Sequence, residues 1–248
     1  MDSQPITHDL ANATVRIECG TASGSGFQFL REDIIVTNCH VIQSHVAAGT
    51  SVTAWTEEAA KSDLQLLAAS VEDEHDFAIL RALDNLGPCR KVLEAQGINE
   101  VMPGSEVAFA GFPHGIRDLL VHRAFISGRY RDLGFYMDGS VNAGNSGGPI
   151  VEVQSGNVIG ITTAKRFLGA VEMSEMSREA DQLRSYLDNL GSRGSVTILG
   201  VDFAEFARLS ARSFYFIKQV IDANANSGIG IGYHIEFALQ KCHELGIS

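Results

Sequence analysis

The stretch AGNSGGPIVEV, residues 143–153, is the most informative part of this 248-residue sequence. Three glycines surround Ser146, at positions 144, 147 and 148. Glycine permits tight turns in which backbone N–H groups converge on one point. Such converging donors form an oxyanion hole, which stabilises the charge that develops in a transition state. Any tight loop can use the same glycines, so the stretch alone leaves Ser146 open as a nucleophile or the tip of a turn.

The residues around Ser146 also match G-x-S-x-G, the nucleophile elbow of the α/β-hydrolases. That motif needs a strand before the serine and a helix directly after it. Here Pro149 follows three residues later, and residues 150–153 are typical of a strand. The elbow interpretation would leave His234 or His243 as the base, and the chain has no parallel βαβ pattern. The context therefore argues against an α/β-hydrolase.

Short runs rich in Val, Ile, Phe and Thr fill the first two thirds of the sequence. Turn residues separate them, as in Asp-Asn-Leu-Gly-Pro at residues 84–88. Regularly spaced short strands without intervening helices indicate antiparallel barrels or a sandwich. A second set of runs begins after Pro103, and residues 91–104 are expected to cross between two halves.

The pattern changes after Lys165, where apolar residues recur at three- and four-residue steps and predict two amphipathic helices. The first carries Met176, Ala180, Leu183, Leu187 and Leu190, and the second carries Phe203, Phe206, Phe214, Ile217 and Ile221. A break at residues 191–194 would let these helices form a hairpin. Residues 228–235, GIGIGYHI, then predict a last strand before a closing helix. The alternative places the last strand at residues 168–173, LGAVEM, with a helical extension after it.

A catalytic serine needs partners, because its hydroxyl is a weak nucleophile unless an imidazole accepts its proton. The imidazole in turn needs a carboxylate that fixes its tautomer. His40 follows an apolar run in VTNCHVI, and Asp76 begins another in HDFAIL. The simpler interpretations are a histidine at a strand end and a solvated carboxylate. Cys39 is a poor alternative nucleophile, because Ser146 already has the glycine-rich loop.

In their order and spacing, these motifs resemble trypsin-like serine proteases of the chymotrypsin fold, and within them the bacterial HtrA-type branch. The resemblance rests on ATVRIECG, SGSGFQF, VTNCHVI, DFAIL, GSEVAFAGFPHG, DGSVNAGNSGGPIVEVQSGNVIGITTA and GIGIGYHIEFAL. It implies a mainly β protein with two antiparallel six-stranded β-barrels packed face to face, a helical insertion and a C-terminal helix. The PDZ domain that is common in HtrA-type proteins is not expected.

The resemblance also implies a division of the chain. An N-terminal tail is expected at residues 1–12, and a first barrel carrying His40 and Asp76 at residues 13–99. The second barrel, with Ser146 and the closing helix, would comprise residues 100–165 and 228–248. Residues 166–227 would be the helical insertion, either a packed ornament or a lid or docking element that gates the cleft or receives a regulatory partner.

The function implied is that of a serine endopeptidase acting through an acyl-enzyme. His40 would be the general base, Asp76 the orienting acid and Ser146 the nucleophile. The backbone N–H groups of Gly144 and Ser146 would form the oxyanion hole. The expected substrate pocket consists of Ser140 at its floor, Asn142, Ala143, Thr163, Ala164 and Ile231. An acid at the floor would select Lys or Arg, but Ser140 is not an acid. This pocket is therefore expected to prefer small or medium aliphatic residues.

Asn145 departs from the pattern of the secreted digestive relatives, which have an aspartate there. That aspartate pairs with a newly cut N-terminal ammonium and switches the site on. A neutral amide cannot make this charge-assisted interaction. We therefore expect activity that does not depend on trimming of the N-terminus.

Composition excludes several other classes of function. The formal net charge of -11 argues against a nucleic-acid binder, and no apolar stretch is long enough to span a membrane. The start of the sequence shows no secretory signal, and Cys19, Cys39, Cys89 and Cys242 are scattered, so a cytoplasmic protein with free thiols is expected. Neither a cofactor nor a metal site is expected, and the partner is a protein or peptide substrate. The alternative is a noncatalytic or latent protein-binding module on the same fold.

Overall fold

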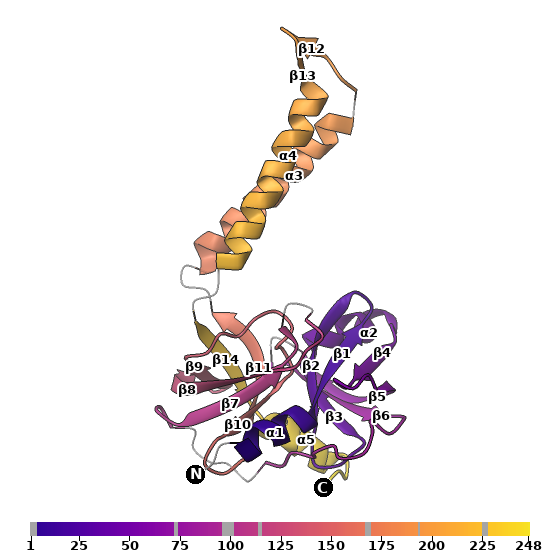
Figure 1. Ribbon diagram of the computed structural model, residues 1–248, viewed down its shortest axis with the longest axis vertical. Coiled ribbons are helices and arrows are strands. Elements are labelled where there is room, and N and C mark those ends of the chain that lie inside the picture. The colour runs from indigo at the N-terminus through magenta and orange to yellow at the C-terminus, as the bar shows by residue number, and fades with distance from the viewer. Residues whose placement is uncertain are drawn as a thin grey trace. The chain divides into compact units, whose positions relative to one another are not determined.

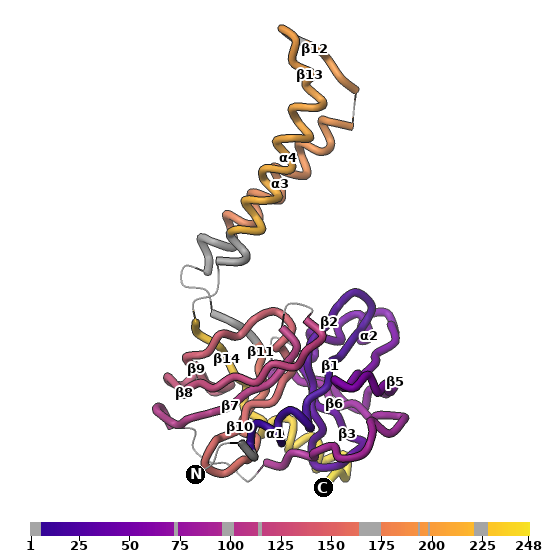
Figure 2. Tube along the Cα trace, in the orientation of Figure 1, coloured from indigo at the N-terminus to yellow at the C-terminus, as the bar shows by residue number. Residues whose placement is uncertain are grey.

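The structure, a computed structural model, describes residues 4–71, 74–95, 102–113, 116–166, 170–192, 194–224 and 228–248. The chain divides into two compact units. The barrel unit comprises Met1–Lys165 and Gly228–Ser248, and the hairpin unit comprises Arg166–Ser227. Figure 1 shows the elements of both units, and Figure 2 follows the chain through them.

The first barrel of the barrel unit is closed, with strand order β1-β2-β3-β6-β5-β4. Its strands are β1 (Thr14–Cys19), β2 (Ala22–Gln28), β3 (Ile34–Thr37), β4 (Val52–Trp55), β5 (Lys61–Ser70) and β6 (Phe77–Ala82). The short helices η1 (His40–Ile42) and α2 (Gln43–Ala48) follow β3. Ile34 and Val36 pack into a cluster shared with the second barrel, whereas Ile35 packs into the interior of the first. Both faces of β3 are therefore buried, which explains its uninterrupted apolar sequence.

The second barrel is also closed, with strand order β10-β11-β14-β9-β8-β7. Its strands are β7 (Glu106–Gly111), β8 (Leu120–Tyr130), β9 (Gly134–Met137), β10 (Pro149–Glu152), β11 (Val158–Arg166) and β14 (Ile229–His234). β14 pairs with β9, with Ile231 opposite Tyr136. The prediction of two antiparallel six-stranded barrels is confirmed. The alternative last strand at residues 168–173 is wrong, because residues from Ala170 onward belong to a helix.

Two helices complete the barrel unit (Figure 1). Residues 4–13, which the sequence assigns mostly to a tail, form helix α1 (Gln4–Ala13). Leu10 and Ala13 are fully buried, in the same cluster as Ala238 and Cys242 of helix α5 (Glu236–Glu244). Helix α1 is therefore packed into the core. Of the expected crossover at residues 91–104, residues 96–101 lie outside the described part.

The hairpin unit consists of two long helices and a short β-ribbon between them. Its elements are α3 (Ala170–Ser192), β12 (Thr197–Ile198), β13 (Val201–Asp202) and α4 (Phe203–Asn224). The helix α3 continues through Gly191, past the start of the predicted break. A Cβ atom at Gly191 would lie 3.0 Å from Arg208 Cγ and 3.3 Å from the carbonyl of Ala204, so the two helices approach closely here. No helix in the described ranges is long and apolar enough to cross a membrane.

Asp202 begins helix α4 as a capping residue. Its Oδ1 accepts hydrogen bonds from the backbone N–H groups of Ala204 at 2.9 Å and Glu205 at 3.0 Å. These bonds satisfy donors that the first turn of a helix leaves without partners. Hydrogen bonds from the Ser195 hydroxyl and from the Glu205 N–H lower the pKa of the Asp202 carboxyl.

Candidate active site

The backbone brings His40 and Asp76 to one edge of the first barrel. Strands β3 and β6 are antiparallel neighbours, with Thr37 opposite Ala78. His40 lies shortly after the end of β3, and Asp76 directly precedes β6, so the two residues meet although 36 positions separate them. Asp76 has a φ of 45°, a left-handed conformation that is costly for a residue other than glycine. A 2.7 Å hydrogen bond from Asn38 Nδ2 to the Asp76 carbonyl holds it there.

The Asp76 carboxylate is buried and accepts hydrogen bonds on both oxygens. Its Oδ2 lies 2.7 Å from His40 Nδ1, and its Oδ1 accepts from the His40 backbone N–H at 3.1 Å. The Thr163 hydroxyl donates to the same Oδ2 at 2.6 Å. Asp76 is 1% exposed, whereas the His40 side chain is 28% exposed. A carboxylate held in this way favours the tautomer with its proton on Nδ1 and an unprotonated Nε2.

The second barrel places Ser146 beside Thr163, which bonds to Asp76. The backbone carbonyl of Ser146 accepts from Ser25 N at 2.8 Å, and its hydroxyl donates to the Thr163 carbonyl at 3.2 Å. Thr163 therefore contacts Asp76 through its hydroxyl and Ser146 through its carbonyl. The sequence predicts Thr163 only as a pocket residue. One signal for a further role was present in the sequence, namely two adjacent polar residues, Thr162 and Thr163, on a strand that enters the core. In the structure both are nearly inaccessible to solvent.

The loop before Ser146 has the conformation that its glycines permit. Gly144 and Gly147 have φ values of 100° and 89°. A Cβ atom would lie 2.2 Å from the Phe112 carbonyl oxygen at the first position and 2.1 Å from the Ser25 carbonyl oxygen at the second. Both positions therefore require glycine. Within the part of the chain that the structure describes, the backbone N–H groups of Gly144 and Ser146 donate to no protein acceptor.

Ser25 is a site residue that the sequence did not single out. It is fully buried on β2, and its hydroxyl donates to the Gly144 carbonyl at 2.6 Å. The same hydroxyl accepts from the backbone N–H of Phe112 at 3.0 Å. Together with the bond from Ser25 N to the Ser146 carbonyl, these contacts hold the loop at both of its ends. The Gly-Ser-Gly sequence at residues 24–26 suggests only a turn, so its letters do not disclose this role.

Ser25→Ala should lower kcat for peptide hydrolysis about 10- to 100-fold and leave KM within about threefold. The substitution removes the donor to Gly144 and leaves the buried Phe112 N–H without its acceptor. The loss of these hydrogen bonds should destabilise this conformation of the loop by about 1–3 kcal/mol. Steady-state kinetics on a peptide substrate measure the split between kcat and KM. Ser23→Ala, at an exposed position of the same strand, is the matched control. Equal kcat values for both variants would remove Ser25 from the positioning of the loop.

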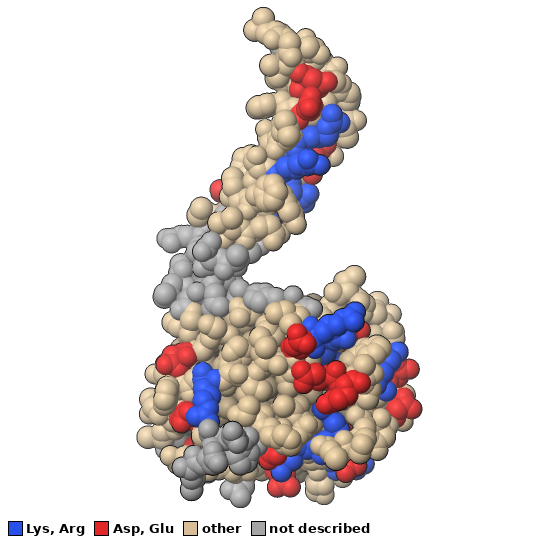
Figure 3. Space-filling model, viewed as in Figure 1, with Lys and Arg blue, Asp and Glu red and all other residues tan. Residues whose placement is uncertain are grey.

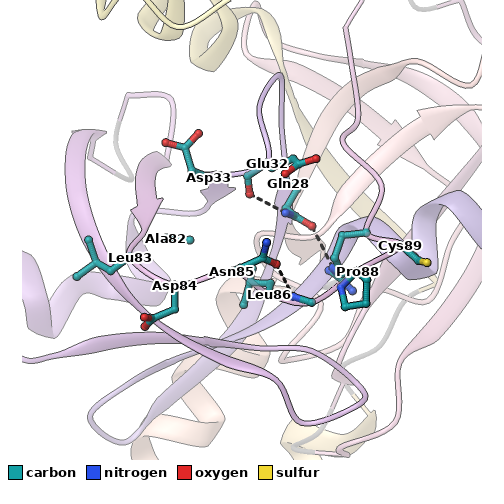
Figure 4. A pocket seen from close by; sticks show the side chains of 12 residues that line it. Gln28, Glu32, Asp33, Ala82, Leu83, Asp84, Asn85, Leu86, Pro88 and Cys89 are labelled. Atoms are coloured by element: carbon teal, nitrogen blue, oxygen red, sulfur yellow. Dashed lines mark hydrogen bonds between the residues drawn. The ribbon is translucent and has the colours of Figure 1, made fainter.

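The structure gives the solvent exposure of five of the six predicted pocket residues, whose common pocket stays a prediction. Thr163 and Ile231 are buried at 7% exposure each, Asn142 is half-buried, and Ser140 and Ala143 are exposed. The side chain of Ala164 lies outside what the structure describes. A pocket of about 460 Å³ lies elsewhere in the first barrel, lined by residues of the ranges 28–33 and 82–90 (Figure 4). Its polar groups bond to one another, as Arg90 Nε does to Gln28 Oε1 at 3.0 Å. None of the predicted catalytic residues lines it.

Asn145 is fully buried beside the loop. Neither its Nδ2 nor its Oδ1 has a hydrogen-bond partner in the described residues. Gly111 allows it this space, because a Cβ there would lie 3.0 Å from Asn145 Oδ1. An aspartate at this position would bury a charge without a partner, which is far more costly than burying an amide. The environment therefore suits the neutral residue that the chain carries.

The cysteines give no better nucleophile. None of the four cysteines, all in described ranges, forms a disulfide; Cys19, Cys39 and Cys242 are buried and Cys89 is exposed. Burial raises the pKa of the Cys242 thiol to about 11, so this thiol is protonated at neutral pH. In the described ranges, no group of three or more His, Cys, Asp or Glu side chains could hold a metal ion.

Comparison with known proteins gives the family. The profile of the trypsin-like peptidase domain matches residues 24–161, more than half of the chain, and this range contains His40, Asp76 and Ser146. The chain belongs to the trypsin-like peptidase family. Its curated relatives place it in the HtrA-type branch. It is 36% identical over 152 residues to a probable periplasmic serine endoprotease, DegP-like, of Brucella suis. That alignment covers 58% of this chain and 28% of the relative.

A second curated relative agrees with this placement, and a solved structure shares the fold. The chloroplastic Protease Do-like 1 of Arabidopsis thaliana is 30% identical over 203 residues, which cover 76% of this chain and 44% of the relative. This trypsin-like chain thus spans less than half the length of either curated relative. In fold it resembles the serine endoprotease from Yersinia pestis, with a TM-score of 0.57 and 24% identity. That likeness covers 66% of this chain and 58% of the other.

Proposed function

We propose that this chain is a serine endopeptidase in which His40 is the general base, Asp76 orients it and Ser146 is the nucleophile. The backbone N–H groups of Gly144 and Ser146 form the proposed oxyanion hole. The observation that carries the proposal is the buried Asp76 carboxylate, which lies 2.7 Å from His40 Nδ1 and is bound by the Thr163 hydroxyl at 2.6 Å. A carboxylate with only a structural role would not need to orient a half-exposed imidazole.

In the proposed acylation, Ser146 Oγ attacks the carbonyl carbon of the substrate, and its proton moves to His40 Nε2. The hydroxyl has one proton, which it donates to the Thr163 carbonyl at rest, so it must turn toward the imidazole first. Asp76 stabilises the imidazolium that forms, and the oxyanion hole stabilises the negative oxygen. His40 then protonates the leaving amine, and water hydrolyses the acyl-enzyme by the same route.

We propose a preference for small or medium aliphatic residues before the cut. Support comes from the residue types, because Ser140 offers no acid for Lys or Arg, and Ile231 is a buried apolar side chain on β14. Pockets discriminate one methylene by only about 1–3 kcal/mol, so the proposed preference is graded.

The proposed setting is a regulated effector protease in the cytoplasm, with a protein partner at the hairpin unit and no role for nucleic acid or membrane. Four cysteines that form no disulfide support a reducing compartment, although the Brucella relative is named as periplasmic. The chain continues from Thr163 directly into the hairpin unit at Arg166, which supports a regulatory role for that unit.

Labelling with a fluorophosphonate probe tests the proposed activity. The folded chain should be labelled at one residue, and mass spectrometry of a digest should map the label to Ser146. Prior alkylation with iodoacetamide should leave the labelling unchanged, because no thiol takes part. Heat-unfolded protein is the control for nonspecific reaction. A folded chain that is not labelled would contradict an active site at rest and favour a latent or noncatalytic binding module.

A further inference from the structure

The two helices of the hairpin unit contact each other through small side chains. Ala180 of α3 and Ala204, Ala207 and Ala211 of α4 are its buried apolar residues in the described ranges. Phe214 and Lys218 of α4 are half-buried. They continue the spacing of residues 204, 207 and 211, so the contact face of α4 has a heptad pattern. Such a narrow contact between two helices leaves little apolar surface buried. Helices in water depend mainly on packing of their apolar face, so this unit lacks most of that packing.

Large apolar side chains of both helices instead remain exposed at heptad spacing. On α3, Met176, Leu183 and Leu190 are 54%, 46% and 40% exposed and recur every seven residues. On α4, Phe203 and Ile217 are 49% and 46% exposed, two heptads apart. A strict seven-residue repeat is the pattern that packs against another helix.

These residues lie on one side of the hairpin. Met176, Leu183 and Leu190 each precede a residue of the contact face by one position, as do Phe203 and Ile217. The helices are antiparallel, so positions that precede the contact face by one residue lie on the same side of the pair. Tyr186 and Phe206, which are 61% and 56% exposed, also fall on this side. We call it the apolar side; its polar members are Glu179, Ser210 and Ser213.

The opposite side carries most of the described charges, and the exposed Tyr215 also lies on it. Arg178, Asp181 and Asp188 of α3 and Glu205, Arg208 and Arg212 of α4 follow the contact face instead of preceding it. Arg184 joins this side by bonding to Asp181 at 3.0 Å and to Asp188 at 3.2 Å. Figure 3 shows the charged side chains of the hairpin gathered along one edge, while the other edge is almost without them. The hairpin therefore has one side suited to water and one suited to burial.

We propose that the apolar side binds the apolar side of a second copy of this chain, so that two hairpins form a four-helix bundle. The seven large side chains of the apolar side expose roughly 80–100 Å² each, hence roughly 600–700 Å² per copy, close to the ~800 Å² per partner of a standard interface. The same surface on both copies makes a closed, two-fold symmetric contact. The two copies have the same heptad spacing, so their side chains can interlock in the register of a four-helix bundle.

The distribution of charge favours this partner over a polyanion. Residues 166–227 contain seven Lys or Arg and eight Asp or Glu, a net charge of -1, so the rest of the chain carries -10 of the total -11. An anionic membrane or a nucleic acid would be repelled by the barrel unit. The hairpins themselves are nearly neutral, so the contact between their apolar sides adds little repulsion of its own. This inference names the partner of the hairpin unit in the proposed function, and it does not depend on the peptidase activity.

Sedimentation velocity of the 248-residue chain, at about 1 to 100 μM, tests the pairing. We expect a discrete species with twice the 26.7 kDa mass of one chain. Leu183→Glu combined with Phe206→Glu should raise the dimer dissociation constant at least 100-fold. The matched control is Gln182→Glu with Gln219→Glu, two exposed positions off the apolar side, which should leave the dissociation constant unchanged.

A second variant distinguishes loss of dimerisation from unfolding of the hairpin. Ser210→Leu combined with Ser213→Leu replaces two polar members of the apolar side and should lower the dissociation constant at least tenfold. A wild-type chain that stays at single-chain mass at 100 μM would overturn the proposal. So would open-ended aggregation, or a single-chain species that floats with phosphatidylcholine vesicles, which would identify a lipid partner. Fluorophosphonate labelling of the same samples reports the peptidase separately, so failure of one proposal is visible without the other.

Discussion

Ser146→Ala should lower kcat for hydrolysis of an unfolded protein substrate by about 10⁶-fold, because it removes the proposed nucleophile. Two cysteines in the described part of the chain are buried and are poor substitutes for it. Cys39 is 6% exposed, and the thiol of Cys242 is fully buried with its pKa raised to about 11. Release of fluorescence from labelled casein measures the rate.

The folded state should change little, because the Ser146 hydroxyl makes one 3.2 Å bond to the Thr163 carbonyl and is half-buried. A thermal melt of the variant should therefore match the wild type to within a few degrees. Ser155→Ala, at an exposed turn where the hydroxyl bonds to Glu152 Oε2, is the matched control and should keep full activity. Residual hydrolysis in Ser146→Ala above about 1% of the wild-type rate would mean that another residue performs the chemistry.

The barrels of this trypsin-like chain were predictable because their strands correspond to short local patterns in the sequence. Strand β3 begins with three buried apolar residues, IIV, and β6 begins with four, FAIL, so both are visible as short apolar runs. The order of His40, Asp76 and Ser146 is likewise readable, because each lies at the edge of such a run. The last strand, β14, was identifiable by its alternating glycines.

Features that depend on distant contacts were not predictable in the same way. Helix α1 has only 10 residues, and its stability comes from burial of Leu10 and Ala13 against residues more than 90 positions away. The Ser25 hydroxyl acts on Gly144, 119 positions later, and nothing near Ser25 in the sequence encodes that meeting. The bond between Thr163 and Asp76 joins the two barrels, so it depends on how they pack.

Asp76→Asn should lower kcat by about 10⁴-fold near pH 7, because an amide cannot accept the hydrogen bonds that the carboxylate accepts. Oδ2 accepts from both His40 Nδ1–H and the Thr163 hydroxyl, and Oδ1 accepts from the His40 backbone N–H. An amide has one acceptor oxygen for these three donors. If its nitrogen faces His40, the imidazole takes the other tautomer, and Nε2 then carries the proton and cannot act as the base.

The pH dependence distinguishes this mechanism from general damage to the fold. The proposed role predicts a loss in kcat with KM within about threefold, and a partial recovery of the rate at high pH, where hydroxide can replace the missing base. Asp84→Asn, at an exposed carboxylate of the same barrel, should have wild-type kinetics. Thr163→Val removes one donor to Oδ2 but keeps the carboxylate, so its effect should be smaller than that of Asp76→Asn. An Asp76→Asn enzyme with wild-type kcat would show that the 2.7 Å contact with His40 does not serve the reaction.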